Sequence, residues 1–492
     1  MVRAAVLGLG RSGLAAAIGV RRQGGEAVVF DRSPRAELAK GEIGDRAAAE
    51  GIEVVYGFDS TLPEGFETLI VNPAVDRRHP LLADAVARGI EVIGEVEFAY
   101  RLARAPIVAI TGTNGKSTTT AMTVRCLEAV GERPILCGNI FGSGLPETTL
   151  TEAALEADQD RTLVAEISSF QLEWVREFRP AVAAITNITP DHLDRYDAFE
   201  EYAATKMRIV AAQTAEDYAV IRANDPVVRL GTSGRHGRSP IQRVRTVGAF
   251  GEDSEYDEHF LRILDRKIPL DELPFSEPHN LANAGMAAIL TDSLLRWRAT
   301  REPGGHAAHK LQDDLASLQA GIQAKRSVYQ RRGPLPTAAI APEIVEALKG
   351  FPGLAHRMER VGEKGGVLYV NNSMCTNPAA VVASLQALKR DSRVLIGGKN
   401  KGLDFSPLRQ FLGVGRHKPY IYGSDGAILA DMLGVRGPVY ASMDDAFAAA
   451  QAEIRPGEAL ILAPGCASTD GFRDFRHRGD RFRELAQDAL GR

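Results

Sequence analysis

The sequence predicts an α/β protein of three domains, and three observations support this fold class. The chain has 492 residues, which is too long for one hydrophobic core. Short apolar runs of strand length alternate with helix-compatible stretches, as expected for parallel sheets covered by helices. This alternation begins afresh near residues 2, 105 and 353. We therefore expect domains at 1–104, 105–352 and 353–492, with an insertion at about 300–348 in the second.

The first domain is predicted to be Rossmann-like. Its expected strands are 2–7, 27–30, 52–55, 68–71 and 90–93. The first strand runs into the turn Gly8-Leu9-Gly10-Arg11-Ser12-Gly13, and Asp31 ends the second strand, which matches the dinucleotide fingerprint. Such a turn can bind the pyrophosphate of NAD, bind another pyrophosphate, or only pack a helix against a sheet. An NAD-dependent oxidoreductase is therefore one hypothesis from this segment.

The second domain opens with a predicted phosphate-binding loop. Residues 111–118, Thr-Gly-Thr-Asn-Gly-Lys-Ser-Thr, follow the apolar run 106–110 and begin a helix-compatible stretch. Glycines let backbone N–H groups converge on phosphate oxygens, Lys116 can reach the outer phosphates, and Ser117 can hold Mg²⁺. The loop is shorter than the standard P-loop, because Ile110 replaces its first glycine and Gly112 takes over. The segment predicts a domain that binds a nucleoside triphosphate.

Polar side chains follow the next two predicted strands, 162–167 and 181–186. Glu166 lies at the end of the first, and His192 comes shortly after the second. Because the carboxyl ends of parallel strands line one crevice, we expect Lys116, Glu166 and His192 to face the same ligand. A metal-binding role for Glu166 is favoured over a solvated acid, since an unpaired charge in an apolar strand is costly. Position alone leaves His192 as a ligand, a general base or a structural cap.

The third domain is predicted to be a second Rossmann-like unit. Its expected strands, 367–370, 393–396 and 459–463, each end in polar residues. The stretch before it, from about 300 to 348, begins with a polar run and continues with a helical pattern. We interpret that stretch as an insertion or an elaborated edge of the second domain.

The composition is that of a soluble globular protein. The formal net charge is −4, with 25% charged and 45% hydrophobic residues, so nucleic acid is not an expected partner. The N-terminus does not resemble a signal peptide, and no apolar stretch is long enough for a bilayer. Cys126, Cys137, Cys375 and Cys466 lack the spacing of a metal site or a disulfide framework, which fits a reduced compartment. We expect a cytoplasmic monomer with no membrane contact.

Taken together, the motifs resemble the Mur ligases of peptidoglycan synthesis. The later segments narrow the resemblance to the branch that adds glutamate, and the match fails only near 300–348. The matching segments are 111–118, 166–173, 187–196, 279–284, 351–357, 397–405 and 462–475.

The resemblance implies a reaction and its cofactors. It implies a ligase that uses ATP to phosphorylate the carboxylate of UDP-N-acetylmuramoyl-L-alanine, after which the amine of D-glutamate attacks the acyl phosphate. It also implies two Mg²⁺ ions and a carbamate on Lys206, which would turn a cation into an anion suited to a metal site. Without the resemblance, Lys206 reads as a surface helix residue.

Several alternatives remain open beside this interpretation. They are a related branch that adds L-glutamate to the same acceptor, an ATP-gated binding protein without catalysis, and the oxidoreductase named above. A polyglutamylating folate ligase shares the central loop, but it lacks the nucleotide-sugar domain that residues 2–100 are expected to form.

The resemblance implies roles for individual residues, matched motif by motif. The catalytic set is Lys116, Glu166, His192 and Lys206, and the magnesium set is Ser117, Glu166, His192 and Lys206. ATP is expected at Gly112, Thr113, Asn114, Gly115, Lys116, Ser117, Thr118, Asn280 and Arg357, with His356 beside Arg357 at the domain hinge. The UDP-linked acceptor is expected at Gly10, Arg11, Ser12, Asp31, Asn72 and Asn139. Glutamate is expected at Thr376, Lys401, Ser468 and Phe475.

Two positions depart from the pattern. Where the family often has Asn-Asp-Ser-Lys, residues 371–374 are Asn-Asn-Ser-Met, so Asn372 and Met374 replace an acid and a base together. The local charge is unchanged, so we expect the loop to persist with an altered nucleotide or phosphate contact. The departure leaves the enantiomer of glutamate open, and the retained glutamate set favours D-glutamate.

Overall fold

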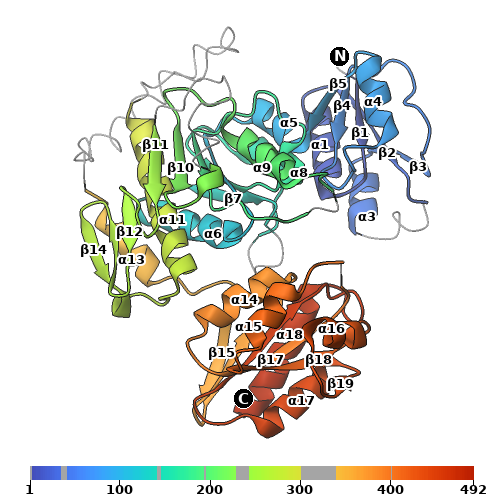
Figure 1. The fold of residues 1–492 in the computed structure, drawn as a ribbon. Coiled ribbons are helices and arrows are strands. Elements are labelled where there is room, and N and C mark those ends of the chain that lie inside the picture. The colour runs from blue at the N-terminus through green and yellow to red at the C-terminus, as the bar shows by residue number, and fades with distance from the viewer. Residues whose placement is uncertain are drawn as a thin grey trace. The chain divides into compact units, whose positions relative to one another are not determined.

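The computed structural model describes residues 3–34, 42–140, 146–192, 195–228, 243–300, 339–400 and 402–491. Residues up to Phe351 belong to one compact unit, and those from Pro352 belong to a second. The first unit contains two sheets and the second contains one, which gives an α/β fold of three sheets (Figure 1). None of the described helices is both long and apolar enough to cross a membrane.

The first sheet is parallel throughout, in the order β3-β2-β1-β4-β5. Alternate residues of β1 enter two apolar cores, one with α1 and one with α4, so helices cover both faces (Figure 1). The five predicted strands are confirmed to within one residue at each end. The elements are β1 (Arg3–Leu7), α1 (Arg11–Arg22), β2 (Glu26–Asp31), α3 (Glu42–Ala49), β3 (Glu53–Tyr56), β4 (Thr68–Val71), α4 (Pro80–Ala87), β5 (Glu91–Gly94) and α5 (Glu95–Leu102).

The second sheet has nine strands in the order β14-β13-β12-β11-β10-β9-β6-β8-β7. Its predicted strands β6, β8 and β9 are confirmed, and β6 lies between the other two. The antiparallel pairs formed by β12, β13 and β14 were not predicted. The strands are β6 (Ile107–Thr111), β7 (Pro134–Gly138), β8 (Thr162–Glu166), β9 (Val182–Ile185), β10 (Tyr218–Arg222), β11 (Val244–Val247), β12 (Ser254–Tyr256), β13 (Phe260–Ile263) and β14 (Arg266–Pro269).

The helices of this second domain are α6 (Lys116–Ala129), α7 (Leu150–Glu156), α8 (Ser169–Leu172), α9 (Phe199–Met207), α11 (Pro278–Ala299) and α13 (Pro342–Lys349). Both α11 and α13 pack against α6. Most of the expected insertion, 301–338, lies outside the described residues. Its last part forms α13, whose Ile344 and Leu348 are buried.

Two buried glutamates of α5 join the first and second domains. The Glu95 carboxylate accepts hydrogen bonds from the backbone N and the Oγ1 of Thr151, at 2.8 and 2.7 Å. Burial raises the pKa of the Glu95 carboxyl. The Glu97 carboxylate accepts from the backbone N–H groups of Arg176, Glu177 and Phe178. Because buried donors and acceptors must be paired, these bonds fix the two sheets against each other.

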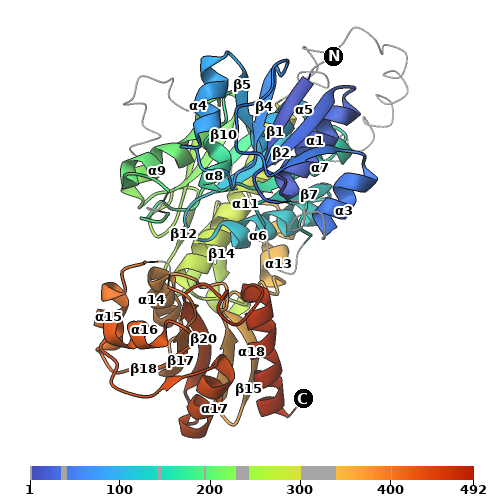
Figure 2. The same ribbon diagram turned by 90° about the vertical axis from the view of Figure 1, so that its right-hand side faces the viewer.

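The second unit has six strands in the order β15-β16-β20-β17-β18-β19, and only the β15–β16 pair is antiparallel. Helices α14, α15 and α16 cover one face and α17 and α18 the other (Figure 2). The predicted strands β16, β17 and β20 are confirmed. The elements are β15 (Glu359–Lys364), β16 (Val367–Asn371), α14 (Pro378–Ala387), β17 (Ser392–Gly397), α15 (Ser406–Leu412), β18 (His417–Tyr422), α16 (Gly426–Leu433), β19 (Val439–Tyr440), α17 (Met443–Glu453), β20 (Ala459–Gly465) and α18 (Phe475–Leu490).

Candidate active site

The predicted phosphate-binding loop connects β6 to the N-terminus of α6, as expected. Gly112 has a φ of 146° and Gly115 a φ of 86°, which are conformations that favour glycine. A Cβ at Gly112 would overlap the hydroxyl of Thr186, and one at Gly115 would lie 2.6 Å from Oδ1 of Asn283. These two positions therefore require glycine both for the backbone conformation and for the space around it.

The loop is held by the segment that follows β9. Thr186 Oγ1 and Asn187 Nδ2 donate to the carbonyl oxygen of Asn114, at 2.6 and 2.8 Å. In return, the backbone N–H of Asn114 donates to Asn187 Oδ1 at 3.1 Å. Thr113 Oγ1 donates to the carbonyl oxygen of Thr189 at 3.0 Å. The loop is thus held at the end of the neighbouring strand by hydrogen bonds within the protein.

Two lysine ammonium groups meet at this loop. Lys116 Nζ donates to the carbonyl oxygens of Gly112 and Thr113, at 3.0 and 2.9 Å. Lys206 Nζ donates to the same Gly112 oxygen at 2.8 Å, and its side chain is buried. Burial lowers the pKa of Lys206 well below its ordinary value, and the charge of Lys116 lowers it further. The surface position that the helix pattern alone suggests for Lys206 is wrong, because α9 turns this side chain into the protein.

Glu166 lies in the same region and carries a buried oxygen without a partner. The residue is 3% exposed, and its Oε2 accepts no hydrogen bond from the described protein atoms. The alternative of a solvated strand-end acid is therefore wrong. A buried carboxylate oxygen without a donor is costly, and a cation beside it would remove that cost.

These residues fit a bound magnesium ion. No group of three or more His, Cys, Asp or Glu side chains forms a metal cluster in the part of the chain that the structure describes. Magnesium usually takes few protein ligands and shares the phosphate oxygens of its nucleotide. Glu166 at the end of β8 and the buried Ser117 in the first turn of α6 carry oxygen donors of the kind that magnesium takes.

His192 adopts a left-handed backbone conformation, with a φ of 54°. Its carbonyl oxygen accepts from the backbone N–H groups of Arg195 and Tyr196, at 3.0 and 3.1 Å. Its ring centroid lies 4.8 Å from that of Phe170, and its Nε2 lies 3.7 Å from Oδ2 of Asp191. Residues with positive φ occur at functional sites and in tight turns, and the two bonds to its carbonyl oxygen also give His192 a structural role in this turn.

In the first domain, Asp31 fixes the glycine turn. Its carboxylate accepts from the backbone N–H groups of Leu9 and Ser33, at 2.6 and 2.8 Å. Asn72 is buried against the same turn, where its Nδ2 donates to the carbonyl oxygen of Gly8 at 3.4 Å. Asp31, the acidic residue of the dinucleotide fingerprint, is thus hydrogen-bonded to the backbone of the glycine turn.

Two further residues of the set expected to bind the UDP-linked substrate are Arg11, in the first domain, and Asn139, after β7 in the second domain. Arg11 forms an ion pair with Glu147. The backbone N–H of Asn139 donates to the carbonyl oxygen of Glu166 at 2.7 Å, which places Asn139 beside the carboxyl end of β8. The structure therefore brings Asn139 beside Glu166 and ties Arg11 to the second domain.

Asn280 lies in the first turn of α11, where its Nδ2 donates to Glu277 Oε2 at 3.2 Å. One turn further along, the buried Asn283 approaches Gly115 of the phosphate loop. The helix that carries the expected adenine contact thus begins beside the loop.

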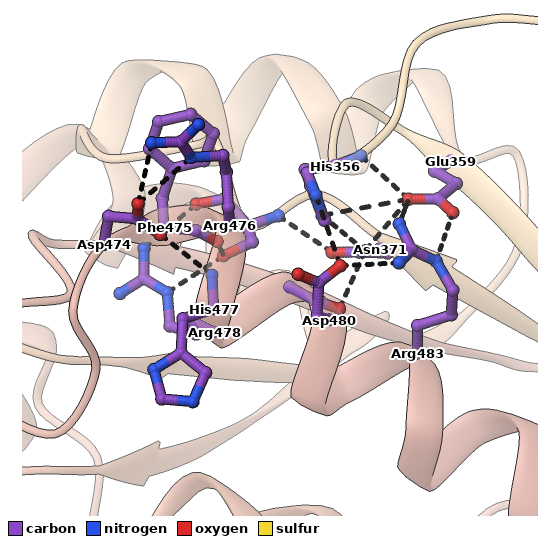
Figure 3. A network of polar contacts seen from close by, with 12 residues as sticks. His356, Glu359, Asn371, Asp474, Phe475, Arg476, His477, Arg478, Asp480 and Arg483 are labelled. Carbon is purple, nitrogen blue, oxygen red and sulfur yellow. Dashed lines mark hydrogen bonds and ion pairs between the residues drawn. The ribbon is translucent and has the colours of Figure 1, made fainter. Parts of the chain in front are cut away.

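In the second unit, His356 is buried in a polar network shown in Figure 3. Its Nδ1 lies 3.1 Å from Asn371 Nδ2, and its Nε2 lies 3.6 Å from an oxygen of Asp480. Glu359 accepts from the backbone N–H of His356 at 2.8 Å and pairs with Arg483. Burial, followed by the charge of Arg483, lowers the pKa of His356.

A fully buried arginine that sequence analysis missed joins the expected glutamate loops. Arg478, which is labelled in Figure 3, is 0% exposed. It donates to Ser373 Oγ at 3.0 Å and to the carbonyl oxygen of Cys466 at 3.2 Å. Ser373 Oγ in turn donates to the carbonyl oxygen of Phe475 at 2.7 Å. One arginine in a highly charged helix gives no sequence signal of burial.

These bonds connect the segments after β16 and β20 with the start of α18. The segments carry Thr376, Ser468 and Phe475, so the structure gathers these three expected residues at one edge of the sheet. Lys401 lies outside the described residues.

The two departing residues have partners of their own. Asn372 Oδ1 accepts from the backbone N–H of Met358 at 3.1 Å, and its Nδ2 donates to Ser384 Oγ at 2.7 Å. Met374 Sδ accepts from Arg357 Nη2 at 3.1 Å. The loop keeps a defined geometry with a neutral amide and a thioether.

Comparison with known proteins adds independent information. Residues 110–291 match the Mur ligase middle domain, and residues 2–94 match the N-terminal domain described as Mur ligase MurD-like. UDP-N-acetylmuramoylalanine--D-glutamate ligase of Koribacter versatilis (strain Ellin345) is 33% identical over 489 residues, covering 99% of this chain and 97% of its own. The protein of the same name from Geobacter metallireducens is 34% identical over 496 residues, covering 99% of this chain and 97% of its own.

Solved structures support the fold. UDP-N-acetylmuramate-alanine ligase MurC from Thermotoga maritima has a TM-score of 0.56 at 15% identity, covering 99% of this chain and 100% of that one. MurF ligase from Thermotoga maritima in complex with ADP has a TM-score of 0.54 at 15% identity, covering 95% of each chain. At these identities the likeness concerns the fold alone.

Proposed function

Because the chain belongs to the Mur ligase family, in its MurD-like branch, we propose that it is an ATP-dependent ligase that joins D-glutamate to UDP-N-acetylmuramoyl-L-alanine in peptidoglycan precursor synthesis. Full-length relatives that are 33% and 34% identical carry this activity in their names. The observation that supports it most directly is the buried, unpartnered oxygen of Glu166, in a site where Lys116 and Lys206 share one loop carbonyl.

The reaction requires activation of a carboxylate. An amine cannot displace an oxide ion from a carboxylate, so one carboxylate oxygen of the acceptor first takes the γ-phosphoryl group of ATP and ADP leaves. The amine nitrogen of glutamate then attacks the acyl carbon, the bond to the phosphorylated oxygen breaks, and inorganic phosphate leaves. Before this attack the ammonium group of glutamate gives one proton to a base or to solvent, and the nitrogen gives up a second proton as the amide forms.

The phosphates of ATP would be bound by positively charged side chains and by backbone N–H groups of the loop. Lys116 would exchange its two loop carbonyls for the outer phosphates, while the N-terminus of α6 and the loop N–H groups bind the inner ones. Magnesium, held by Ser117 and Glu166 with His192 near a second ion, would neutralise charge that develops during phosphoryl transfer. Asn280 and Arg357 are proposed to contact the adenine and the phosphates.

Lys206 suits the proposed carbamate for a physical reason. Carbon dioxide reacts with a neutral amine, and burial already favours the neutral form of Lys206. The resulting anion would lie among Lys116 and the proposed magnesium ligands. This chemistry would place a negative charge beside the positive charge of Lys116, which is an attractive pair.

The first domain is proposed to bind the UDP-linked acceptor, and the third domain is proposed to bind glutamate. The glycine turn of the first domain, with Gly10, Arg11, Ser12 and Asp31, would bind the UDP pyrophosphate, with Asn72 near the uracil and Asn139 near the sugar-linked portion. Thr376, Lys401, Ser468 and Phe475 of the third domain would bind glutamate. We propose that the enzyme acts as a monomer in the cytoplasm.

Release of inorganic phosphate tests the assignment. Purified protein is incubated with ATP, Mg²⁺ and UDP-N-acetylmuramoyl-L-alanine, with D-glutamate or L-glutamate added in separate reactions. Release that depends on D-glutamate is the expected result. Preference for L-glutamate would move the chain to the related branch, and no release with either enantiomer would reject the ligase assignment.

A further inference from the structure

Arg195, in the segment after β9, contacts both the first and the second domain. Its side chain is 10% exposed, and it forms a two-pronged ion pair with Glu173, with Nε and Nη2 at 2.9 and 2.6 Å from the two carboxylate oxygens. Nη2 also donates to the carbonyl oxygen of Val75, in the first domain, at 2.8 Å. The guanidinium carbon lies 4.2 Å from the ring centroid of Phe170.

On the first-domain side, Val75 is continuous with the glycine turn. The backbone N–H of Val75 donates to the carbonyl oxygen of Asn72 at 2.9 Å, which closes a short turn after β4. A Cβ at Gly8 would lie 3.0 Å from Asn72 Cβ and 3.3 Å from Val75 Cγ2, so this turn packs directly on the glycine turn. A shift of Val75 would therefore move the glycine turn, where the UDP-linked acceptor is proposed to bind.

On the second-domain side, Arg195 reaches the His192 segment by two routes. Its backbone N–H donates to the carbonyl oxygen of His192 at 3.0 Å. Its guanidinium covers the Phe170 ring, which also contacts the His192 ring at 4.8 Å and the Tyr196 ring at 6.3 Å between centroids. Tyr196 OH donates to Glu173 Oε1 at 2.9 Å and holds the acid of the ion pair in place.

The geometry of this contact needs arginine. Both side chains of the pair are nearly buried, at 10% and 4% exposure, so solvent screens their attraction little. A planar guanidinium can bind both oxygens of Glu173, donate to Val75 and cover an aromatic ring at once, which a lysine ammonium cannot do. Arg77 also links the two domains through Glu201, but at 24% and 34% exposure that pair is weaker.

We propose that Arg195 is a positioning residue that couples the acceptor-binding turn of the first domain to the Phe170–His192 side of the reaction centre. This inference rests on the proposed function. It adds a residue that contacts both the turn proposed to bind the UDP-linked acceptor and the ring beside His192. Arg195 works through Val75 and Phe170, and its loss should therefore disturb acceptor binding and turnover together.

The test compares Arg195→Lys with a matched control, Arg179→Lys. Arg179 makes a similar ion pair in the same domain, with Nε 2.6 Å from Oδ2 of the buried Asp217, and contacts neither loop. Hydrogen–deuterium exchange of residues 72–79 is measured first, without ligands. We expect exchange there to rise about 10-fold in Arg195→Lys and to stay unchanged in Arg179→Lys.

Steady-state kinetics then separate positioning from folding. In Arg195→Lys we expect the KM for UDP-N-acetylmuramoyl-L-alanine to rise about 10-fold and kcat to fall by a similar factor, with the KM for ATP changed less than about twofold. Unchanged exchange at 72–79 would overturn the proposal. So would increased exchange with kinetics equal to those of Arg179→Lys, because the residue would then be only structural.

Two further arms keep the result decisive. Should Arg195→Lys fail to fold, Phe170→Leu removes only the ring between Arg195 and His192, and it should lower kcat with the acceptor KM unchanged; a wild-type kcat would then overturn the proposal. The exchange experiment needs no substrate. A wild-type protein that releases no phosphate would therefore reject the proposed function, while exchange at 72–79 would still show whether Arg195 holds the turn of the first domain in place, and unchanged exchange would still overturn the proposal.

Discussion

Lys116 and Lys206 donate to one acceptor, the carbonyl oxygen of Gly112, at 3.0 and 2.8 Å. They come from α6 and α9, which are separated by three strands in the chain, β7, β8 and β9, and brought together by the sheet order. Two ammonium groups at one oxygen repel each other, and this repulsion contributes to the lowered pKa of Lys206. An anion, such as a phosphate or a carbamate, would relieve it.

Lys206→Ala should nearly abolish turnover without weakening the fold. We expect phosphate release to fall at least about 100-fold, because the site loses the proposed carbamate anion. Removing a buried amine relieves its desolvation, so the melting temperature at pH 7 should stay equal or rise. Added short carboxylates should restore part of the rate by occupying the vacated space. A variant with wild-type turnover would remove Lys206 from the site.

Glu166→Gln should separate the charge of this residue from its shape. The substitution keeps the volume and removes the negative charge, so we expect turnover to fall roughly 100-fold or more and the Mg²⁺ concentration for half-maximal rate to rise. Stability should change by less than about 1 kcal/mol, since the wild-type carboxylate already has an oxygen without a partner. An unchanged magnesium requirement would contradict the metal role.

Gly112→Ala should disrupt the phosphate loop. The new Cβ would meet the Thr186 hydroxyl, and φ is 146°, so the loop must shift. We expect a loss of roughly 1–3 kcal/mol in stability and no measurable binding of ATP by calorimetry. Gly89→Ala is the matched control: φ is +74° and nothing lies within 4 Å of its Cβ, so it tests strain without the steric overlap. Equal ATP affinity in the two variants would argue against the overlap.

Arg478→Lys should damage the glutamate side of the reaction. The substitution removes the fork that joins Ser373 to Cys466 and leaves a buried ammonium in its place. We expect the unfolding free energy to fall by roughly 2–4 kcal/mol and the KM for glutamate to rise more than that for ATP. Denaturant unfolding and separate KM titrations measure both effects. A variant with equal KM changes for the two substrates would show that Arg478 supports the fold generally.

His356 should make stability depend on pH. Its folded-state pKa is lowered, first by burial and then by Arg483, so the unfolded chain binds the proton more readily. Stability from this residue is therefore complete above the ordinary histidine pKa of about 6.5 and declines as pH falls toward the lowered value. His356→Asn, which tolerates the φ of 60°, should lose less stability between pH 7 and pH 5 than the wild type. Identical pH dependence in thermal unfolding would contradict this.

The sequence predicted eleven of the strands, β1 to β6, β8, β9, β16, β17 and β20, because each is a short apolar run. The parallel strands β7, β10, β11, β18 and β19 were not predicted. The sequence also did not predict β13 and β14, where Arg262, Arg266 and Lys267 interrupt the apolar pattern and pairing comes from neighbouring strands. The phosphate loop could be predicted because its glycines are required by the backbone conformation of the loop itself, so the signal lies within a few consecutive residues. Burial of Lys206, Arg195 and Arg478 depends on segments distant in the chain, so no local pattern indicates it.

The two glutamates of α5 also bear on how such enzymes can be recombined. Glu97 accepts hydrogen bonds from three consecutive backbone amides of the second domain, and Glu95 accepts hydrogen bonds from Thr151. A chimera joined near residue 104 would therefore have to reproduce this whole buried contact between two domains of different parents. A chimera joined after Phe351 would take both sides of this contact from one parent. We therefore expect chimeras of related enzymes to fold when joined after Phe351 and to lose stability when joined near residue 104.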